Sequence, residues 1–154
     1  MVAVDGSENA DRAVKVASRI AKDNNADLTV LHVILLPPAV YSGDVAIDIG
    51  KIESEARVGA EKIVSTASSL AEEEEVKPKT AVVQRMDSAA RGITEYANEN
   101  AIDLIVVGTR GLGGFKRLVL GSVASGVFRD PPRCRVHTLD NSCLRLDFLL
   151  FSKR

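Results

Sequence analysis

The chain has 154 residues, of which 45% are hydrophobic and 27% charged, so it can bury the core of one globular domain and is not compositionally disordered. A net charge of −1 provides no long-range attraction to nucleic acid or to an anionic membrane. The two cysteines lack CxxC spacing, the N-terminus does not resemble a secretion signal, and no apolar run approaches the roughly 20 residues of a membrane span, so we expect a cytoplasmic protein without nucleic-acid or membrane partners.

The first elements in chain order are a strand, a helix and a second strand. Residues 1–4 form a short apolar strand that begins at Met1 itself, so we expect it to be clipped relative to an intact domain. Ser7 is a suitable N-cap for the helix that follows, which ends at Asn24. Residues 28–34 form a nearly continuous apolar run, which is typical of a strand covered on both faces.

The middle of the chain predicts an irregular segment followed by a long helix. Two prolines end the second strand, and residues 39–50 have no clear periodicity. Residues 52–75 are rich in Ala, Glu and Lys, which favours a helix. Its last residues, 72–75, are all glutamates, and negative charge opposes the helix dipole at a C-terminal end. We therefore expect this end to be solvated and frayed.

The second half continues the alternation of strands and helices. We predict a strand at 80–84, a helix capped by Asp87 or Ser88 that runs to 98, a strand at 104–107, a helix at 121–128 and a candidate fifth strand at 135–139. Such alternation indicates an α/β fold with parallel strands joined by right-handed crossovers. Ligands of these sheets bind at the carboxyl ends of the strands, which makes Asp5, Val33 and Gly108 candidate site neighbours.

Residues 108–122 carry the chemistry most clearly. This segment follows an apolar strand, contains five glycines and ends where a helix begins. Glycines allow backbone N–H groups to approach an anion, and a helix N-terminus adds aligned donors. Arg110, Lys116 and Arg117 are near enough in sequence to add positive charge. A glycine-rich surface loop before a capped helix would give the same pattern, and the spacing is neither a Walker A loop nor the compact dinucleotide fingerprint.

The spacing Gly108-x2-Gly111-x9-Gly121-Ser122 resembles the ATP-binding signature of the universal stress protein family. The opening Val2-Ala3-Val4-Asp5-Gly6-Ser7 and the segments 31–34 and 101–108 are similar to the matching parts of that family. The resemblance covers residues 1 to about 130. It implies an α/β domain over residues 1–140 with a three-layer open-sheet fold, in which a mainly parallel five-stranded sheet has helices on both faces. This architecture is Rossmann-like, of the adenine nucleotide alpha hydrolase-like type, and the family is usually dimeric.

The resemblance also implies an ATP site in the ATP-binding branch of the family. Asp5 would contact the nucleoside, with Ala3 and Val4 lining the same edge, and Val33 would flank the adenine. The ribose and phosphate contacts would come from Val107, Gly108, Gly111, Gly121, Ser122 and Val123. We expect no catalytic residue and no protein-bound metal, because Mg²⁺ would bind through the ATP phosphates.

Two features depart from the family pattern. Ala124 stands where the family often has a hydroxyl residue, which removes one phosphate hydrogen bond. Residues 141–154 form an atypical C-terminal tail, which leaves the mode of homodimer formation open. The function implied is a regulatory ATP-binding protein of the stress response; a nucleotide-free dimerising module of the same fold and a slow ATPase remain as alternatives. The residues alone favour Asp5 as the start of a turn with Gly6, whereas the resemblance favours a nucleoside contact. They also favour His32 as a satisfied histidine within its strand rather than as a ligand.

Overall fold

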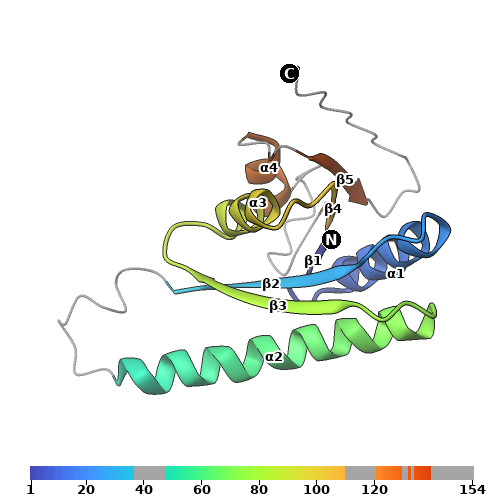
Figure 1. Ribbon diagram of the computed structural model, residues 1–154. Coiled ribbons are helices and arrows are strands. Elements are labelled where there is room, and N and C mark those ends of the chain that lie inside the picture. The colour runs from blue at the N-terminus through green and yellow to red at the C-terminus, as the bar shows by residue number, and fades with distance from the viewer. Residues whose placement is uncertain (37–47, 110–120, 130–131, 133, 140–154) are drawn as a thin grey trace.

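A computed structural model of the chain describes residues 1–36, 48–109, 121–129, 132 and 134–139, in which strands and helices alternate (Figure 1). The elements are β1 (Val2–Ala3), α1 (Glu8–Asp23), β2 (Thr29–Leu35), α2 (Ile49–Glu73), β3 (Lys79–Arg85), α3 (Ala89–Glu99), β4 (Leu104–Gly108), α4 (Ser122–Arg129) and β5 (Arg135–Leu139). The predicted order is confirmed, including the fifth strand. Gly111 and the tail 141–154 lie outside the described residues.

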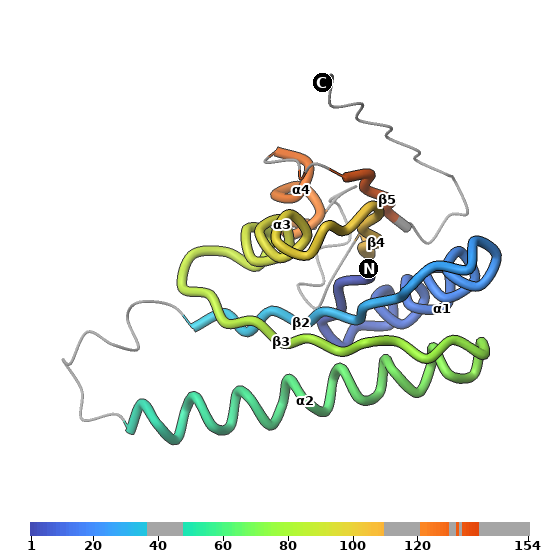
Figure 2. Tube along the Cα trace, in the orientation of Figure 1, coloured from blue at the N-terminus to red at the C-terminus, as the bar shows by residue number. Residues whose placement is uncertain are grey.

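The five strands form one parallel sheet in the order β3-β2-β1-β4-β5. The short β1 lies at its centre, between β2 and β4 (Figure 2). The chain first moves from β1 through β2 to β3 and then returns to the other side of β1 to form β4 and β5. This confirms the predicted parallel open sheet and places the reversal of strand order at β1.

Two helices cover each face of the sheet. On one face, α1 and α2 pack on β1, β2 and β4 through small alanines and valines. The buried residues of this layer are Val2, Val4, Ala10, Ala13, Val14, Ala17, Ala21, Leu28, Val30, Val64, Ala67, Ala71 and Val106. On the other face, α3 and α4 cover the side chains that point the opposite way from the same strands (Figure 1). Those buried residues are Met1, Leu31, Ala90, Ile93, Ala97, Ile105, Val107, Ala124, Val127 and Val136.

Side-chain caps set the helix boundaries. The predicted cap Ser7 is confirmed, since its Oγ accepts the N–H of Ala10 at 3.3 Å. For α3 the cap is Ser88 rather than Asp87. Helix α2 begins at Ile49, before the predicted start, because the carboxylate of Asp48 accepts the N–H of Lys51 at 3.1 Å and caps it.

The acidic end of α2 is solvated as predicted, since Glu72, Glu73 and Glu75 are exposed, but the prediction that it is frayed is wrong. The helix closes on Glu74, whose backbone N–H donates to the carbonyl of Ala71 at 3.1 Å. The guanidinium of Arg19 donates two hydrogen bonds of 3.2 Å to the Glu74 carboxylate. Lys22 forms an ion pair with Glu75. Arg19 and Lys22, near the C-terminal end of α1, therefore supply the positive charge that the last turn of α2 lacks.

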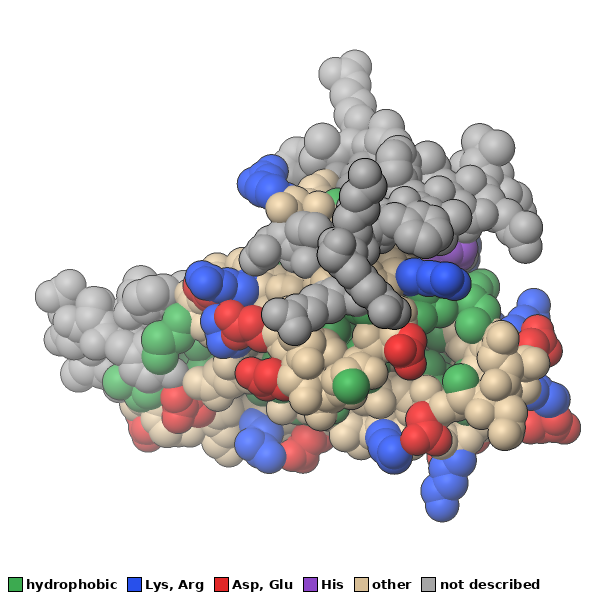
Figure 3. Space-filling model, turned by 45° about the horizontal axis from the view of Figure 1, so that its top comes forward, with side chains coloured by type: hydrophobic (Ala, Val, Ile, Leu, Met, Phe, Trp, Pro, Cys, Tyr) green, Lys and Arg blue, Asp and Glu red, His purple; other side chains and the backbone are tan. Residues whose placement is uncertain are grey.

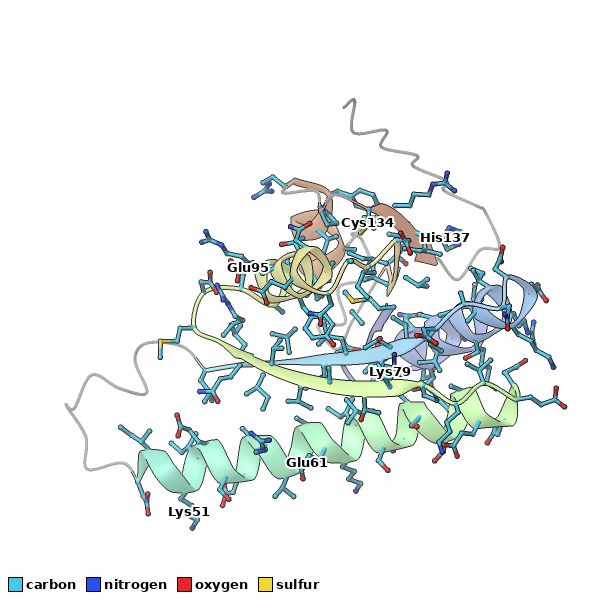
Figure 4. The ribbon with its side chains drawn as sticks, viewed as in Figure 1. Lys51, Glu61, Lys79, Glu95, Cys134 and His137 are labelled. Atoms are coloured by element: carbon cyan, nitrogen blue, oxygen red, sulfur yellow. The ribbon has the colours of Figure 1, made fainter. Side chains whose placement is uncertain are left out.

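The described surface carries mixed charge. On the face shown in Figure 3, acidic and basic side chains are interspersed around the described part of the molecule. Lys51 and Glu61 lie along α2, and Glu95 lies on α3 (Figure 4). Among the described helices, none is both long and apolar enough to cross a bilayer.

Candidate functional site

The carboxyl ends of β1 and β4 lie side by side at the centre of the sheet. Ala3 of β1 pairs with Val107 of β4 and with Leu31 of β2. Asp5 follows β1 by two residues and Gly108 ends β4, so both are brought to one edge of the sheet. Because the strand order reverses at β1, this edge is the switch point at which open α/β sheets bind their ligands.

A compact turn positions Asp5. The N–H of Ser7 donates to Oδ1 of Asp5 at 3.0 Å, and Ser7 in turn caps α1. Gly6 between them has φ +80°, a left-handed conformation that glycine adopts without strain. A Cβ at Gly6 would lie 3.4 Å from Cγ1 of Ile63 in α2, so the turn also packs closely on that helix. The interpretation of Asp5 as the start of a turn is confirmed, and the turn fixes where its carboxylate lies.

Val4, Ala3 and Val33 were also predicted to line this edge, and they lie on different faces of the sheet. The side chain of Val4 is 6% exposed and packs under α1 and α2, so Val4 offers its main chain to this edge. Ala3 and Val33 are half-buried on the opposite face, beneath α3. Val33 lies two residues beyond Leu31, the partner of Ala3, and so reaches the same edge as Asp5.

Helix α3 lies unusually close to Val33. A Cβ added at Gly92 would lie 3.0 Å from Cγ1 of Val33 and 2.9 Å from Cγ of Arg85. The absence of a side chain at Gly92 therefore lets α3 rest directly on the strand residue predicted to flank adenine. Sequence reasoning missed Gly92, because a glycine within a helical pattern does not reveal what it packs against.

The described residues on either side of the glycine segment, Thr109 and Gly121, lie in contact. The N–H of Gly121 donates to the carbonyl of Thr109 at 2.5 Å, so the start of α4 is held beside the end of β4. Thr109 is 2% exposed and was not predicted as part of the site. Arg110, Gly111, Lys116 and Arg117 lie outside the described residues.

Helix α4 begins at this meeting point. Its first residue is Ser122, and Gly121 is the residue that precedes it. The N–H of Ser125 donates to the Gly121 carbonyl at 2.9 Å, which is the first hydrogen bond of the helix. Ser122 and Val123 are exposed. The first backbone N–H groups of an α-helix have no carbonyl partner within the helix, which makes this end a suitable anion-binding position.

Ala124 points away from this opening. It is 1% exposed and belongs to the buried layer beneath α3 and α4. Val127, one turn further along α4, is also fully buried, whereas Val123 is 38% exposed. The first turn of α4 therefore presents Ser122 and Val123 outward and anchors itself through Ala124.

His32 is a half-buried histidine with a defined partner. Its Nδ1 lies 2.7 Å from the carbonyl oxygen of Val4. Since a carbonyl only accepts, Nδ1 carries the hydrogen and donates it. His32 is thus satisfied by the backbone, as the sequence favoured. Sequence reasoning missed its partner, because the register of β1 against β2 is needed to find it.

Among the described residues, no cluster of three or more His, Cys, Asp or Glu side chains could hold a metal ion. Cys134 and His137 lie together on the β5 side of the molecule, away from α2 (Figure 4). Burial raises the pKa of the Cys134 thiol, which favours its neutral form at pH 7. Neither residue belongs to the edge formed by β1 and β4.

These features define a doubly wound α/β protein with a candidate site at the switch point of its sheet. The family model described as "Universal stress protein family" matches residues 1–133. The chain is 33% identical over 133 residues to universal stress protein YxiE of Bacillus subtilis, covering 82% of this chain and 88% of that protein. The chain belongs to the universal stress protein family.

Solved structures of this family have the same fold. A universal stress protein in complex with cAMP superposes with a TM-score of 0.62 at 25% identity, covering 90% of this chain and 92% of that one. The universal stress protein of Archaeoglobus fulgidus in complex with dAMP superposes with a TM-score of 0.67 at 24% identity, covering 90% and 94% of the two chains.

Proposed function

We propose that this chain is a regulatory protein that binds an adenine nucleotide, ATP above all, at the edge where β1 and β4 end. The observation that carries the proposal is the adjacency of two features at the switch point. The turn holding Asp5 follows β1, and the start of α4 returns to Thr109 immediately after β4. One feature offers a carboxylate acceptor, and the other offers backbone donors for an anion.

The two ends of the nucleotide are assigned to these two features. Asp5 accepts hydrogen bonds from the nucleoside, and Val33 packs against the base. The ribose and phosphate contacts come from Val107, Gly108, Gly111, Gly121, Ser122 and Val123. The complexes of family members with cAMP and dAMP support an adenine nucleotide. The glycine spacing, which matches the ATP-binding signature, supports the triphosphate.

Binding rather than turnover is the proposed activity. The sequence lacks a Walker lysine and offers no convincing general base beside the phosphates. Mg²⁺ would be held through phosphate oxygens and water, as this ion prefers, and not by a set of protein ligands. We further propose that the protein acts as a homodimer, with residues 141–154 as a tail separate from the domain of residues 1–140.

Isothermal titration calorimetry with ATP, with and without Mg²⁺, tests the proposal. We expect saturable binding that Asp5→Asn weakens by about 10- to 100-fold, the effect of a hydrogen bond to a charged group. Asn retains an oxygen for the Ser7 N–H, so the variant keeps the turn while losing the charge. Asp103→Asn is the matched control, because Asp103 precedes β4 at the opposite edge of the sheet. Absence of binding to folded wild-type protein would contradict the proposal.

The same preparation separates the alternatives. Phosphate release from ATP well above background, and lost in Asp5→Ala, would instead favour an ATPase. Protein that dimerises in light scattering but binds no adenine nucleotide would instead favour the nucleotide-free module. Ala124 no longer supports that second alternative specifically, because its side chain packs in the core.

A further inference from the structure

His32 of β2 is hydrogen-bonded to the backbone of Val4, the residue directly before Asp5. The ladder between β1 and β2 ends at the pair Ala3 and Leu31, and the N–H of Val4 still donates to the Leu31 carbonyl at 2.9 Å. Beyond that bond the chain leaves the sheet to form the Asp5 turn. At this point the imidazole Nδ1–H of His32 donates to the carbonyl of Val4, with 2.7 Å between Nδ1 and the oxygen.

The hydrogen bond constrains the residue that follows Val4. A peptide unit is planar, so fixing the direction of the Val4 carbonyl also fixes the N–H and Cα of Asp5. On the other side of Asp5, the Ser7 N–H holds the carboxylate through Oδ1 at 3.0 Å. His32 thus restrains the main chain of Asp5, while Ser7 restrains its side chain.

We propose that His32 is a positioning residue for Asp5, which presets the Asp5 carboxylate for an adenine nucleotide by holding the Val4 carbonyl. This inference rests on the proposed nucleotide function. A restraint that exists before the ligand arrives reduces the conformational freedom that binding must remove, and so increases affinity. His32 does not touch the nucleotide itself, and its effect passes through Asp5.

A double-mutant cycle with Asp5 tests this coupling. His32→Leu removes the donor, and we expect it to weaken ATP binding by about 3- to 10-fold, the effect of one intramolecular hydrogen bond. His32→Asn keeps a donor near the position of Nδ1 and should restore most of the affinity. In an Asp5→Ala background, His32→Leu should have little further effect. An equal loss in both backgrounds, or full affinity in folded His32→Leu, would overturn the proposal.

A matched control removes a comparable hydrogen bond far from the site. The side chain of Asn100 donates to the Tyr96 carbonyl at 2.9 Å at the C-terminal end of α3. Asn100→Ala should lower stability slightly and leave the ATP dissociation constant unchanged. A loss of affinity equal to that of His32→Leu would show that general destabilisation, and not positioning, weakens binding.

Two measurements without nucleotide separate this proposal from the nucleotide function. Amide hydrogen exchange at Gly6 and Ser7 should be faster in His32→Leu than in wild type, and unchanged exchange would overturn the positioning role. The ¹⁵N shifts of His32 in wild-type protein should show the Nδ1–H tautomer, and the Nε2–H tautomer would overturn it without any variant. If these results hold and wild type binds no adenine nucleotide, the positioning of Asp5 stands and the nucleotide function fails.

Discussion

The two faces of the sheet are each covered by two helices, but the helices are held differently. On the α1 and α2 face, alanines and valines fill the core, and ion pairs of Arg19 and Lys22 join the ends of the two helices. A Cβ added at Gly59 of α2 would meet nothing within 4 Å. On the α3 and α4 face, Gly92 and Gly126 lie at contacts with no room for a methyl group.

The difference separates stability from positioning. The close contacts on the second face involve the elements that carry candidate site residues, since Gly92 meets Val33 and Gly126 lies one turn beyond Ser122. Helix α3 takes part in both contacts. The first face contains the larger share of buried alanines, and its contact with the Asp5 turn is looser, since a Cβ at Gly6 would lie at an ordinary 3.4 Å from Cγ1 of Ile63. A small change in volume should therefore affect binding on one face and only stability on the other.

The largest effect is expected for Gly126→Ala. The new Cβ would lie 2.6 Å from Cβ of Ala90, and both atoms are attached directly to helix backbone. Carbon atoms pack at about 3.5–4.0 Å, so α3 and α4 must move apart by roughly 1 Å. We expect the free energy of unfolding to fall by about 1–3 kcal/mol in urea denaturation. ATP affinity should fall as well, because α4 carries Ser122.

Two further variants show whether the contact is the cause. Ala90→Gly removes the opposing methyl group, so Gly126→Ala/Ala90→Gly should recover ATP affinity, although the new glycine costs about 1 kcal/mol of helix stability. Gly59→Ala adds a methyl group to an exposed helix position and should raise stability by up to about 1 kcal/mol. If Gly59→Ala and Gly126→Ala had the same effect, the contrast between the faces would be wrong.

Gly92→Ala should affect binding more than stability. Arg85 is long and flexible enough to yield, and alanine favours the helix, so we expect a net change in unfolding free energy within about 1 kcal/mol. Val33 is β-branched and held in β2, so it must shift at the site. ATP affinity should fall a few-fold, measured by calorimetry. Inorganic tripolyphosphate, which has no base, should bind Gly92→Ala as it binds wild type but should bind Gly126→Ala more weakly.

The architecture and the edge of the site could be predicted because they depend on local patterns. Apolar runs bounded by turn residues predicted each strand, and Ser7 and Asn24 marked the ends of α1. Parallel strands bring their carboxyl ends to one edge, so the placement of Asp5 and Gly108 followed from their position directly after a strand or at its end. These inferences need only the order of elements along the chain.

The contacts between elements could not be predicted because they depend on register and helix packing. The helical pattern of α3 does not show that Gly92 rests on Val33. The strand pattern of β2 does not show that His32 lies beside the Val4 carbonyl. The fraying predicted for the acidic end of α2 was wrong for the same reason. The dipole of a single helix does not reveal that Arg19 of the neighbouring helix pairs with Glu74.

The smallest effect concerns that acidic end, on the α1 and α2 face. Hydrogen bonds from Arg19 and Lys22 lower the pKa of Glu74 and Glu75 below the ordinary value of 4.5. A carboxyl with a lowered pKa stabilises the fold fully above its unfolded pKa and loses this contribution as the pH falls through its folded pKa. The two pairs should therefore contribute at pH 7 and lose their effect below pH 4.5.

Replacing both carboxylates tests this contribution. Glu74→Gln/Glu75→Gln should lower stability modestly at pH 7 and flatten the fall in stability between about pH 5 and 3, measured by urea denaturation across pH. The difference from wild type should shrink in high salt, because these ion pairs are exposed. Glu73→Gln, at the same helix end, should keep the wild-type slope. ATP affinity should be unchanged in the double variant; a loss equal to that of Gly92→Ala would show that this face also positions the site.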